Sequence, residues 1–279
     1  MPHAVITGST GGIGAEIAQI LAQQGWSLTL INRSANKADQ QVKAMQEAFP
    51  GVMLTSVLAD LMDTESIRRA AHLLLEHGHA IDALYHISGV LTSDRVLSAQ
   101  GFESHYAVNA LAPYALTQAL RPLLKRESSA APSMVVTMSS SAINAVKSLD
   151  VDALPDPAAI NGLMGAYAAS KMALTVMGTA MAEELRVDNI LIRSIDPGAT
   201  MTPMIKKGDG MPSVLRWVAP LIFAPAAKQA AKIVGAADPA ALRGRTGIYV
   251  AGGKEKSPPK LVADPSVQRQ VLSRLSADS

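Results

Sequence analysis

Short apolar runs alternate with longer amphipathic stretches along most of this chain. We expect strands in the apolar runs, near residues 4–7, 27–31, 52–58, 83–87, 134–139, 190–195 and 247–250. We expect helices near residues 12–24, 37–49, 65–77, 102–125, 167–186 and 226–237, followed by a tail helix near 264–275. Strands that are apolar throughout are typical of a sheet buried on both faces. The pattern therefore predicts an α/β fold, a doubly wound parallel sheet of about seven strands with helices on both faces.

Composition narrows the class of protein. The chain has 279 residues, of which 48% are hydrophobic and 17% charged, as in folded globular proteins. We see no linker or internal repeat, so we expect one domain over residues 1–279. The net charge of +2 is not clustered and gives no argument for a nucleic-acid partner. The lack of cysteine excludes disulfides and thiol catalysis, and the histidines at 72, 77 and 79 lack a further ligand set, so we expect no metal.

No targeting or membrane-spanning segment stands out in the sequence. The first expected strand begins at His3, which leaves no room for a signal peptide. The longest apolar stretch, residues 217–227, is too short to span a bilayer and contains two prolines. We therefore expect a cytoplasmic protein, and a homo-oligomer stays open.

A glycine-rich segment, residues 7–14, joins the first expected strand to the first expected helix. Glycines let the backbone approach a pyrophosphate, and the N–H groups of a helix N-terminus face its charge. The alternative is an ordinary helix-entry turn, but the position after the first strand of a βαβ pattern favours a nucleotide site. The residues that we assign to this site are Gly8, Ser9, Thr10, Gly12, Ile13 and Gly14.

The spacing Thr-Gly-x-x-x-Gly-x-Gly resembles that of the short-chain dehydrogenase/reductase family. Other motifs resemble this family at the matching strand and helix ends: Asn32-Arg33, Ala59-Asp60-Leu61, Ala107-Val108-Asn109, Ser139-Ser140, Tyr167-x-x-x-Lys171 and Asp196-Pro197-Gly198 with Thr202. The resemblance implies a Rossmann-like fold and hydride transfer between a nicotinamide cofactor and a carbonyl or alcohol. It also implies cofactor contacts from Asp60, Leu61, Ser88, Gly89, Asn109, Tyr167, Lys171, Pro197, Gly198, Thr200 and Thr202.

The end of the second expected strand indicates which nicotinamide cofactor is bound. An acidic residue there binds the ribose hydroxyls, whereas a basic group accommodates a 2′-phosphate. Asn32 and Arg33 provide no carboxylate, and a guanidinium can bind a phosphate through two parallel hydrogen bonds. A solvated surface arginine is the alternative. The pattern favours NADP(H) over NAD(H).

Tyr167 and Lys171 lie four residues apart on an expected helix, so their side chains share one face. An ammonium about 4 Å away favours the phenolate by roughly 4 kcal/mol, which lowers the tyrosine pKa by about three units. A general acid or base works best near neutrality. Alone, the pair could equally be a surface tyrosine beside a solvated lysine, but the family pattern favours catalysis.

The resemblance adds two residues to a catalytic tetrad. Ser140 would donate a hydrogen bond to the substrate oxygen as charge develops there, with Ser139 and Ser141 as competitors for the role. Asn109 would hold a water that connects Lys171 to solvent, although a helical asparagine can also be a merely structural polar residue. The cofactor would deliver hydride to the carbonyl carbon while the tyrosine protonates the oxygen.

The chain departs from the family pattern at two places. Residues 86–89 read His-Ile-Ser-Gly where the family has Asn-Asn-Ala-Gly. Gly89 still permits a close backbone approach, but the asparagine bonds that stabilise the sheet are lost, and we expect His86 to be structural. Ser140 and Tyr167 are 27 residues apart, a long spacing that suggests an irregular loop over the site. This spacing resembles the branch of retinol dehydrogenases and protochlorophyllide reductases.

Residues 198–225 follow the Pro-Gly turn on the cofactor side, where a substrate lid would lie. Large apolar side chains are concentrated there: Met201, Met204, Met211, Trp217, Leu221, Ile222 and Phe223. Ordinary core packing is the alternative, but methionines adapt to varied apolar shapes. We therefore predict a bulky, mostly apolar aldehyde or ketone, enclosed by this lid and by the insertion at 141–166.

Two other functions are compatible with the same motifs. A regulator or scaffold would bind NADP(H) without turnover, but it would not need the intact Tyr167–Lys171 pair. A lyase or epimerase would use the cofactor transiently, but its larger C-terminal substrate domain has no space after Gly198. The sequence therefore predicts an NADP(H)-dependent oxidoreductase that interconverts a carbonyl group and an alcohol.

Overall fold

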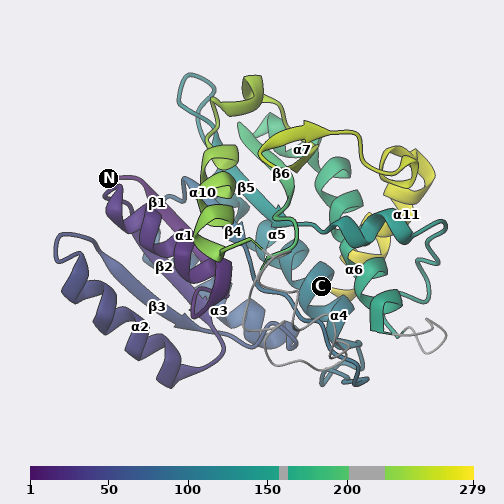
Figure 1. The fold of residues 1–279 in the computed structure, drawn as a ribbon, viewed down its shortest axis with the longest axis horizontal. Helices are drawn as coiled ribbons and strands as arrows, with labels where there is room; N and C mark the ends of the chain where they lie inside the picture. Colours follow the sequence, from purple (N-terminus) through teal and green to yellow (C-terminus); the bar gives the residue numbers. More distant parts are fainter. Residues whose placement is uncertain (157–162, 201–223) are drawn as a thin grey trace.

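A computed structural model of the chain describes residues 1–156, 163–200 and 224–279 (Figure 1). Its strands are β1 (His3–Thr7), β2 (Ser27–Asn32), β3 (Leu54–Leu58), β4 (Ala83–His86), β5 (Ser133–Met138), β6 (Ile190–Asp196), β7 (Ile248–Ala251) and β8 (Lys254–Lys256). In the described residues they form one sheet in the order β3-β2-β1-β4-β5-β6-β7-β8. All neighbours pair in parallel except β7 and β8. The predicted doubly wound α/β fold is confirmed.

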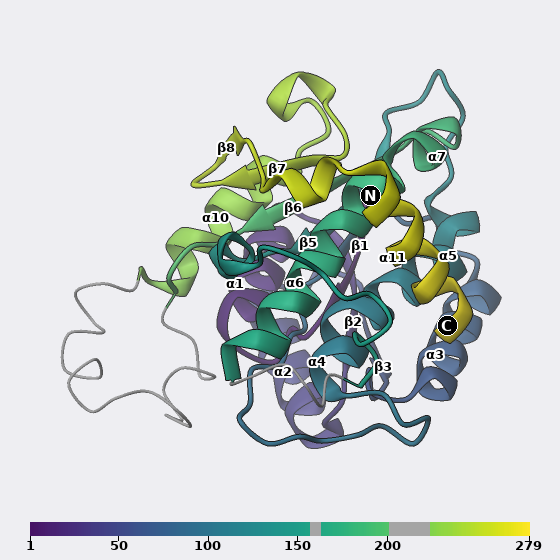
Figure 2. The ribbon, with the colours of Figure 1, turned by 90° about the vertical axis from the view of Figure 1, so that its right-hand side faces the viewer.

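Helices cover both faces of the sheet. They are α1 (Gly12–Gln23), α2 (Ala35–Ala48), α3 (Thr64–His77), α4 (Ser104–Tyr106), α5 (Ala112–Leu124), α6 (Leu163–Ala180), α7 (Ala182–Val187), α10 (Ala226–Ala237) and α11 (Pro265–Asp278). Figure 1 shows α1 and α10 side by side over one face, and the two helices contact each other. Helices α3, α5 and α6 cover the other face, and α11 packs against the outside of α6 (Figure 2).

Two apolar cores lie on the two sides of the sheet. Val5 packs into the core under α3, α5 and α6, whereas its neighbours Ala4 and Ile6 pack into the core under α1 and α10. This division follows from the alternation of side chains along a strand. Every residue of β2, β4, β5 and β6 is buried, which explains why their sequences are mostly apolar.

The sequence pattern missed three features of the fold. The short antiparallel strand β8 is charged and fully exposed, so it carries no apolar signal. The helix expected over residues 102–125 contains a π-helical turn, Ala107–Leu111, between α4 and α5. The helix expected over residues 167–186 begins earlier, at Leu163, and ends at Ala180 before α7.

Arg193 of β6 is a charged side chain that is fully buried within the sheet. Burial lowers the pKa of its guanidinium, and Asp238 partly opposes this effect. All five of its N–H donors reach backbone carbonyls at 2.7–3.2 Å, those of Ala236, Asp238, Pro239, Ala241 and Arg245. The guanidinium therefore fastens the end of α10 and the loop that leads to β7.

Among the helices that the structure describes, none is both long enough and apolar enough to cross a membrane.

Candidate active site

The carboxyl ends of β1, β4, β5 and β6 meet at one edge of the sheet. The segments that follow these strands begin at Gly8, Ile87, Ser139 and Pro197. A ligand of a doubly wound sheet binds outside such strand ends. The assigned site residues in the described part of the chain lie on these segments, on β2 and the segment after β3, or on the adjoining helices.

The glycine-rich loop packs against its neighbours at distances that only glycine permits. Gly8 has a φ of +72°, and a Cβ atom there would lie 2.7 Å from the Oγ of Ser88 and 2.9 Å from its Cα. A Cβ atom on Gly14 would lie 2.3 Å from the carbonyl oxygen of Gly8. The loop, α1 and the segment after β4 therefore form one close-packed backbone cradle.

The N-terminus of α1 opens onto this cradle. Gly11 is its N-cap and supplies no side-chain hydrogen bond to the first N–H groups. Ile13 is buried in the core beneath, which fixes the first turn of the helix. N–H groups that no side chain caps can bind an anion, and the helix dipole favours a negative charge there. The cradle therefore fits the pyrophosphate of a dinucleotide.

Ser9 anchors the loop instead of facing a ligand. Its hydroxyl donates to Oε1 of Gln41 at 2.9 Å and accepts from Nδ2 of Asn32 at 2.9 Å, while Nε2 of Gln41 donates to the Ser9 carbonyl at 2.6 Å. Ser9 is fully buried. Gln41, on α2, was missed by the sequence reasoning, since nothing in the pattern around it distinguishes it from a solvated helical glutamine.

Asn32 ends β2 with one polar atom unpartnered. Its Oδ1 is buried and has no hydrogen-bond partner among the described residues, although its Nδ2 binds Ser9. Arg33, the next residue, is exposed. A buried amide oxygen without a partner is costly unless a ligand satisfies it. A ribose hydroxyl at this strand end would supply the missing donor.

The segment after β3 is held by its own side chains. The backbone N–H of Asp60 donates to Oγ of Ser66 at 3.0 Å, and Oδ1 of Asp60 accepts from the N–H of Met62 at 3.0 Å. Leu61 is buried in the core under α3, α5 and α6. The segment is therefore fixed before any adenine is bound.

Ser140 and Ser139 occupy different environments at the end of β5. The hydroxyl of Ser139 is buried and lies 2.7 Å from that of Thr175, so it is used within the core. Ser140 is half-buried, and its hydroxyl lies close enough to Tyr167 to lower the pKa of that phenol. Ser141 is exposed. Of the three serines, Ser140 is the one that shares a site with the tyrosine.

Lys171 is buried and directed at the backbone. Its Nζ donates to the carbonyl oxygen of Met138 at 2.8 Å and lies 5.8 Å from the centre of the Tyr167 ring. Burial lowers the pKa of Lys171 to about 8. Burial also raises the pKa of Tyr167, an effect that Ser140 opposes and Asp196 reinforces. The predicted lowering of the Tyr167 pKa is therefore wrong for this structure, because desolvation outweighs an ammonium that is turned towards a carbonyl.

Asn109 lies in the π-helical turn, a feature that often occurs at functional sites. Its Oδ1 accepts from the N–H of Val90 at 2.8 Å, and its Nδ2 donates to the Val90 carbonyl and to Oγ of Ser170, each at 3.1 Å. A Cβ atom on Gly89 would lie 3.2 Å from Oδ1 of Asn109 and 3.5 Å from Nζ of Lys171. The structure thus brings these three residues together, while the bridging water stays a prediction.

The turn after β6 is fixed by a buried carboxylate. Oδ1 of Asp196 accepts from the N–H of Gly198 at 2.8 Å, and Oδ2 accepts from the hydroxyl of Tyr249 at 3.0 Å. Thr200 donates to the Gly198 carbonyl at 2.9 Å. Pro197 is between these anchored positions. Thr202 and almost all of the expected lid at 198–225 lie outside the described residues.

His86 is structural, as we expected. It is buried, its Nε2 lies 2.9 Å from Oγ1 of Thr117, and burial lowers its pKa to about 3, which keeps it neutral. Thr7 supplies some of the hydrogen bonds to this segment that we expected to be lost with the two asparagines of the family pattern. Its Oγ1 accepts from the N–H groups of Ile87 and Ser88 at 3.1 and 3.2 Å.

A buried acid–base pair beside the tyrosine was missed entirely. Glu103 and His105 are both almost fully buried, and Nδ1 of His105 lies 2.9 Å from Oε1 of Glu103. The rings of His105 and Tyr167 meet edge to face, with centres 6.3 Å apart and planes at 78°. Burial raises the pKa of Glu103, but hydrogen bonds from His105 and Ser104 outweigh it, so this pKa lies below its usual value. The sequence did offer one signal for this pair: Glu103 and His105 are polar residues at the start of a segment that is otherwise typical of a buried core.

The insertion between Ser140 and Tyr167 is partly core. Val151 and Leu154 are buried with the side chains under α6, so residues 141–156 are not a loose loop. Asp156 forms an ion pair with Arg95. The Pro155 carbonyl accepts from the N–H of Glu103 at 2.7 Å. This part of the insertion therefore packs against the segment after β4. Residues 157–162 lie outside the described residues.

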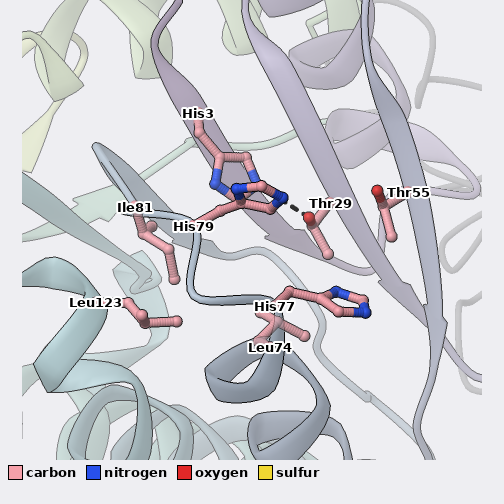
Figure 3. A pocket seen from close by; sticks show the side chains of 8 residues that line it. All are labelled: His3, Thr29, Thr55, Leu74, His77, His79, Ile81 and Leu123. Carbon is pink, nitrogen blue, oxygen red and sulfur yellow. Dashed lines mark hydrogen bonds between the residues drawn. The ribbon is translucent and has the colours of Figure 1, made fainter.

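A small cavity of about 190 Å³ lies at the opposite, amino-terminal end of the strands (Figure 3). It is lined by His3, Thr29, Thr55, Leu74, His77, His79, Ile81 and Leu123. The His3 ring bonds to the Ala80 carbonyl and to Thr29, while His72 lies exposed beside Glu76. In the part of the chain that the structure describes, no three histidine or acidic side chains gather as metal ligands.

Comparison with known proteins identifies the family. Residues 8–238 match the family described as "Enoyl-(Acyl carrier protein) reductase". Short-chain dehydrogenase TIC 32 A, chloroplastic, from Brassica napus is 30% identical over 217 residues, 75% of this chain and 67% of that protein. Retinol dehydrogenase 11 from Homo sapiens is 30% identical over 214 residues, 77% of this chain and 64% of that protein. The solved Pseudomonas aeruginosa RhlG/NADP active-site complex shares the fold, with a TM-score of 0.72 and 24% identity over 90% of this chain and 94% of that one. The chain belongs to the short-chain dehydrogenase/reductase family of oxidoreductases, which act on alcohols and carbonyl groups with a nicotinamide cofactor.

Proposed function

We propose that this chain is an NADP(H)-dependent oxidoreductase that interconverts a bulky, apolar carbonyl compound and its alcohol, with Tyr167 as the general acid/base. The observation that carries the proposal is the grouping of Ser140, Tyr167 and Lys171 beside a glycine cradle that fits a pyrophosphate. The resemblance assigns cofactor contacts to Tyr167 and Lys171 but none to Ser140, so a protein that only binds the cofactor would have no comparable use for the serine.

The chain's own residues divide the work of carbonyl reduction. NADPH, when bound, supplies the hydride that adds to the carbonyl carbon. Ser140 donates a hydrogen bond to the carbonyl oxygen, and the Tyr167 hydroxyl transfers its proton to that oxygen as negative charge develops. The product is the alcohol, and a phenolate is left on Tyr167. Lys171, which is already buried beside the ring, stabilises this phenolate once its ammonium turns from the Met138 carbonyl.

The preference for NADP(H) rests on the end of β2. Arg33 is exposed there, and no carboxylate stands at Asn32 to repel a 2′-phosphate. The solved complex with NADP shows that a related fold accommodates this cofactor. In the same arrangement, the unpartnered Oδ1 of Asn32 accepts from a ribose hydroxyl.

The choice of an apolar substrate rests on sequence and on a relative. The expected lid at 198–225 is rich in methionine and large apolar side chains. The relative named retinol dehydrogenase 11 has a bulky apolar alcohol in its name. Val151 and Leu154 of the insertion also bring apolar side chains towards the helix that carries Tyr167. The single domain and the cytoplasmic location remain predictions, and a homo-oligomer stays open.

The decisive test is NADPH oxidation with a panel of aromatic, terpenoid and long-chain aldehydes and ketones. Tyr167→Phe should lower kcat by about 10²–10⁴-fold while NADPH binding stays near normal, because only the proton donor is lost. Arg33→Ala should narrow the preference for NADPH over NADH, and Arg186→Ala, an exposed arginine on α7, serves as its control.

Three outcomes would each overturn part of the proposal. Strong turnover by Tyr167→Phe would contradict the assignment of Tyr167 as the general acid/base. Equal affinities of the unmutated protein for NADPH and NADH would contradict the preference for NADP(H). Better turnover of small polar carbonyl compounds than of apolar ones would contradict the apolar substrate.

A further inference from the structure

Two side chains on one helical stretch link the segment after β4 to α6. Asn109 binds both backbone groups of Val90 and reaches Ser170 on α6. His105, four residues earlier, accepts at Nε2 from the N–H of Thr92 at 3.2 Å and meets the ring of Tyr167 on α6. The two links come from residues four apart on the helical stretch and reach residues two apart in the segment after β4, Val90 and Thr92.

Both ring nitrogens of His105 are already used. Nε2 accepts a backbone N–H, so it carries no proton, and Nδ1 therefore donates to Oε1 of Glu103. A neutral imidazole with both nitrogens bonded has no free group for a substrate or a metal ion. The contact of His105 with Tyr167 is therefore made by the ring itself, edge to face at 78°.

Glu103 fixes the orientation of that ring. Its carboxylate accepts from Oγ of Ser104 at 2.8 Å, from the N–H of His105 at 2.8 Å and from the His105 ring at 2.9 Å. Its own N–H donates to the Pro155 carbonyl in the insertion at 2.7 Å. The imidazole is thus held at both nitrogens by groups that are themselves anchored.

We propose that His105 is a positioning residue for catalysis, which holds the Tyr167 side chain in one rotamer about Cα–Cβ and so keeps its hydroxyl beside Ser140, where the substrate oxygen binds. A tyrosine at the start of a helix can turn about its side-chain bonds, and a misplaced proton donor loses rate. An adjacent aromatic ring with a fixed plane removes those alternative orientations. This proposal rests on the proposed role of Tyr167 as the acid/base.

The test compares two variants that differ only in an aromatic ring. Glu103→Gln is introduced first, because removing the histidine alone would leave a buried carboxylate without its partner. In that background, His105→Phe retains an aromatic edge and His105→Leu does not, while both lose the bond to Thr92. We expect kcat for NADPH-dependent reduction to be at least about 10-fold lower with leucine than with phenylalanine, with the NADPH Kd equal in the two.

The outcomes separate this proposal from the proposed function. Equal kcat values for the phenylalanine and leucine variants, with Tyr167→Phe inactive in the same background, would overturn the positioning role alone. Strong activity of Tyr167→Phe would overturn the acid/base assignment itself. If the leucine variant folds poorly, NMR of ¹³C-labelled tyrosine in Glu103→Gln/His105→Phe and in the parent gives a second readout. A single Tyr167 rotamer about Cα–Cβ in both supports the proposal, and averaging over several rotamers in the parent would contradict it.

Discussion

Replacing Gly14 by alanine tests whether the close approach of backbone segments creates the cofactor site. Gly14 is a buried helical glycine, so alanine there should gain about 0.5–1 kcal/mol of helix stability if space allowed. Its Cβ would lie only 2.3 Å from the carbonyl oxygen of Gly8, which is backbone and cannot rotate away. The loop and α1 must therefore separate, at a cost of about 1–3 kcal/mol typical of overpacking.

The separation should affect cofactor binding more than folding. It moves the uncapped N–H groups of α1 away from the pyrophosphate, and each charge-assisted hydrogen bond is worth about 1.5–3 kcal/mol. Loss of two such bonds costs about 3 kcal/mol or more, which is about 100-fold in the NADPH Kd. Calorimetric titration of NADPH, together with thermal unfolding, measures both quantities.

Gly235→Ala is the matched control. Gly235 is also a helical glycine, but it is exposed on α10 and a Cβ atom there would have nothing within 4 Å. It should raise stability by about 0.5–1 kcal/mol and leave the NADPH Kd unchanged. A Gly14→Ala protein that bound NADPH as tightly as the parent would refute the reasoning, because the clash would then have no consequence at the site.

Two further predictions concern buried cations. Lys171 has a pKa of about 8 in the folded chain against 10.5 when exposed, so the unfolded state holds an extra proton between these values. The unfolding free energy of the parent, measured against Lys171→Met by urea titration, should therefore rise by about 3 kcal/mol as pH increases through that window, and a flat difference would contradict the burial effect. Arg193→Lys leaves three donors for five carbonyls, so at least two bonds are lost at about 1–3 kcal/mol each. Its Tm should fall by about 4 °C or more, and an unchanged Tm would show that water replaces the guanidinium without cost.

The features that sequence reasoning predicted correctly have a local cause. Parallel strands buried on both faces are mostly apolar, so β2, β5 and β6 were visible as runs rich in apolar residues. Glycines at 8 and 14 stand where no Cβ atom fits, and such a steric requirement restricts the sequence directly. The grouping of Ser140, Tyr167 and Lys171 followed from the family spacing and from the position of each residue at an element end.

The features that it missed depend on partners far along the chain. Strand β8 exists because the chain turns back at Gly252 and Gly253 to pair with β7, and its own residues are charged. The roles of Gln41 and His105 come from contacts with Ser9 and Tyr167, which spacing alone does not reveal. The same reason explains the error over the tyrosine pKa, since the Met138 carbonyl that binds the lysine is 33 residues away.

The order of strands in the sheet has a consequence for how the chain folds during synthesis. Strands β1, β2 and β3 form one half, and from β4 onward each new strand joins the edge left by the one before. A chain that emerges from the ribosome can therefore extend its sheet without reopening it. Helix α6 has to wait longer, because α11, which covers its outer side, is the last of the described elements along the chain (Figure 2). At about 5–20 residues per second, the apolar surface of α6 stays exposed on the nascent chain for on the order of ten seconds before that cover is made.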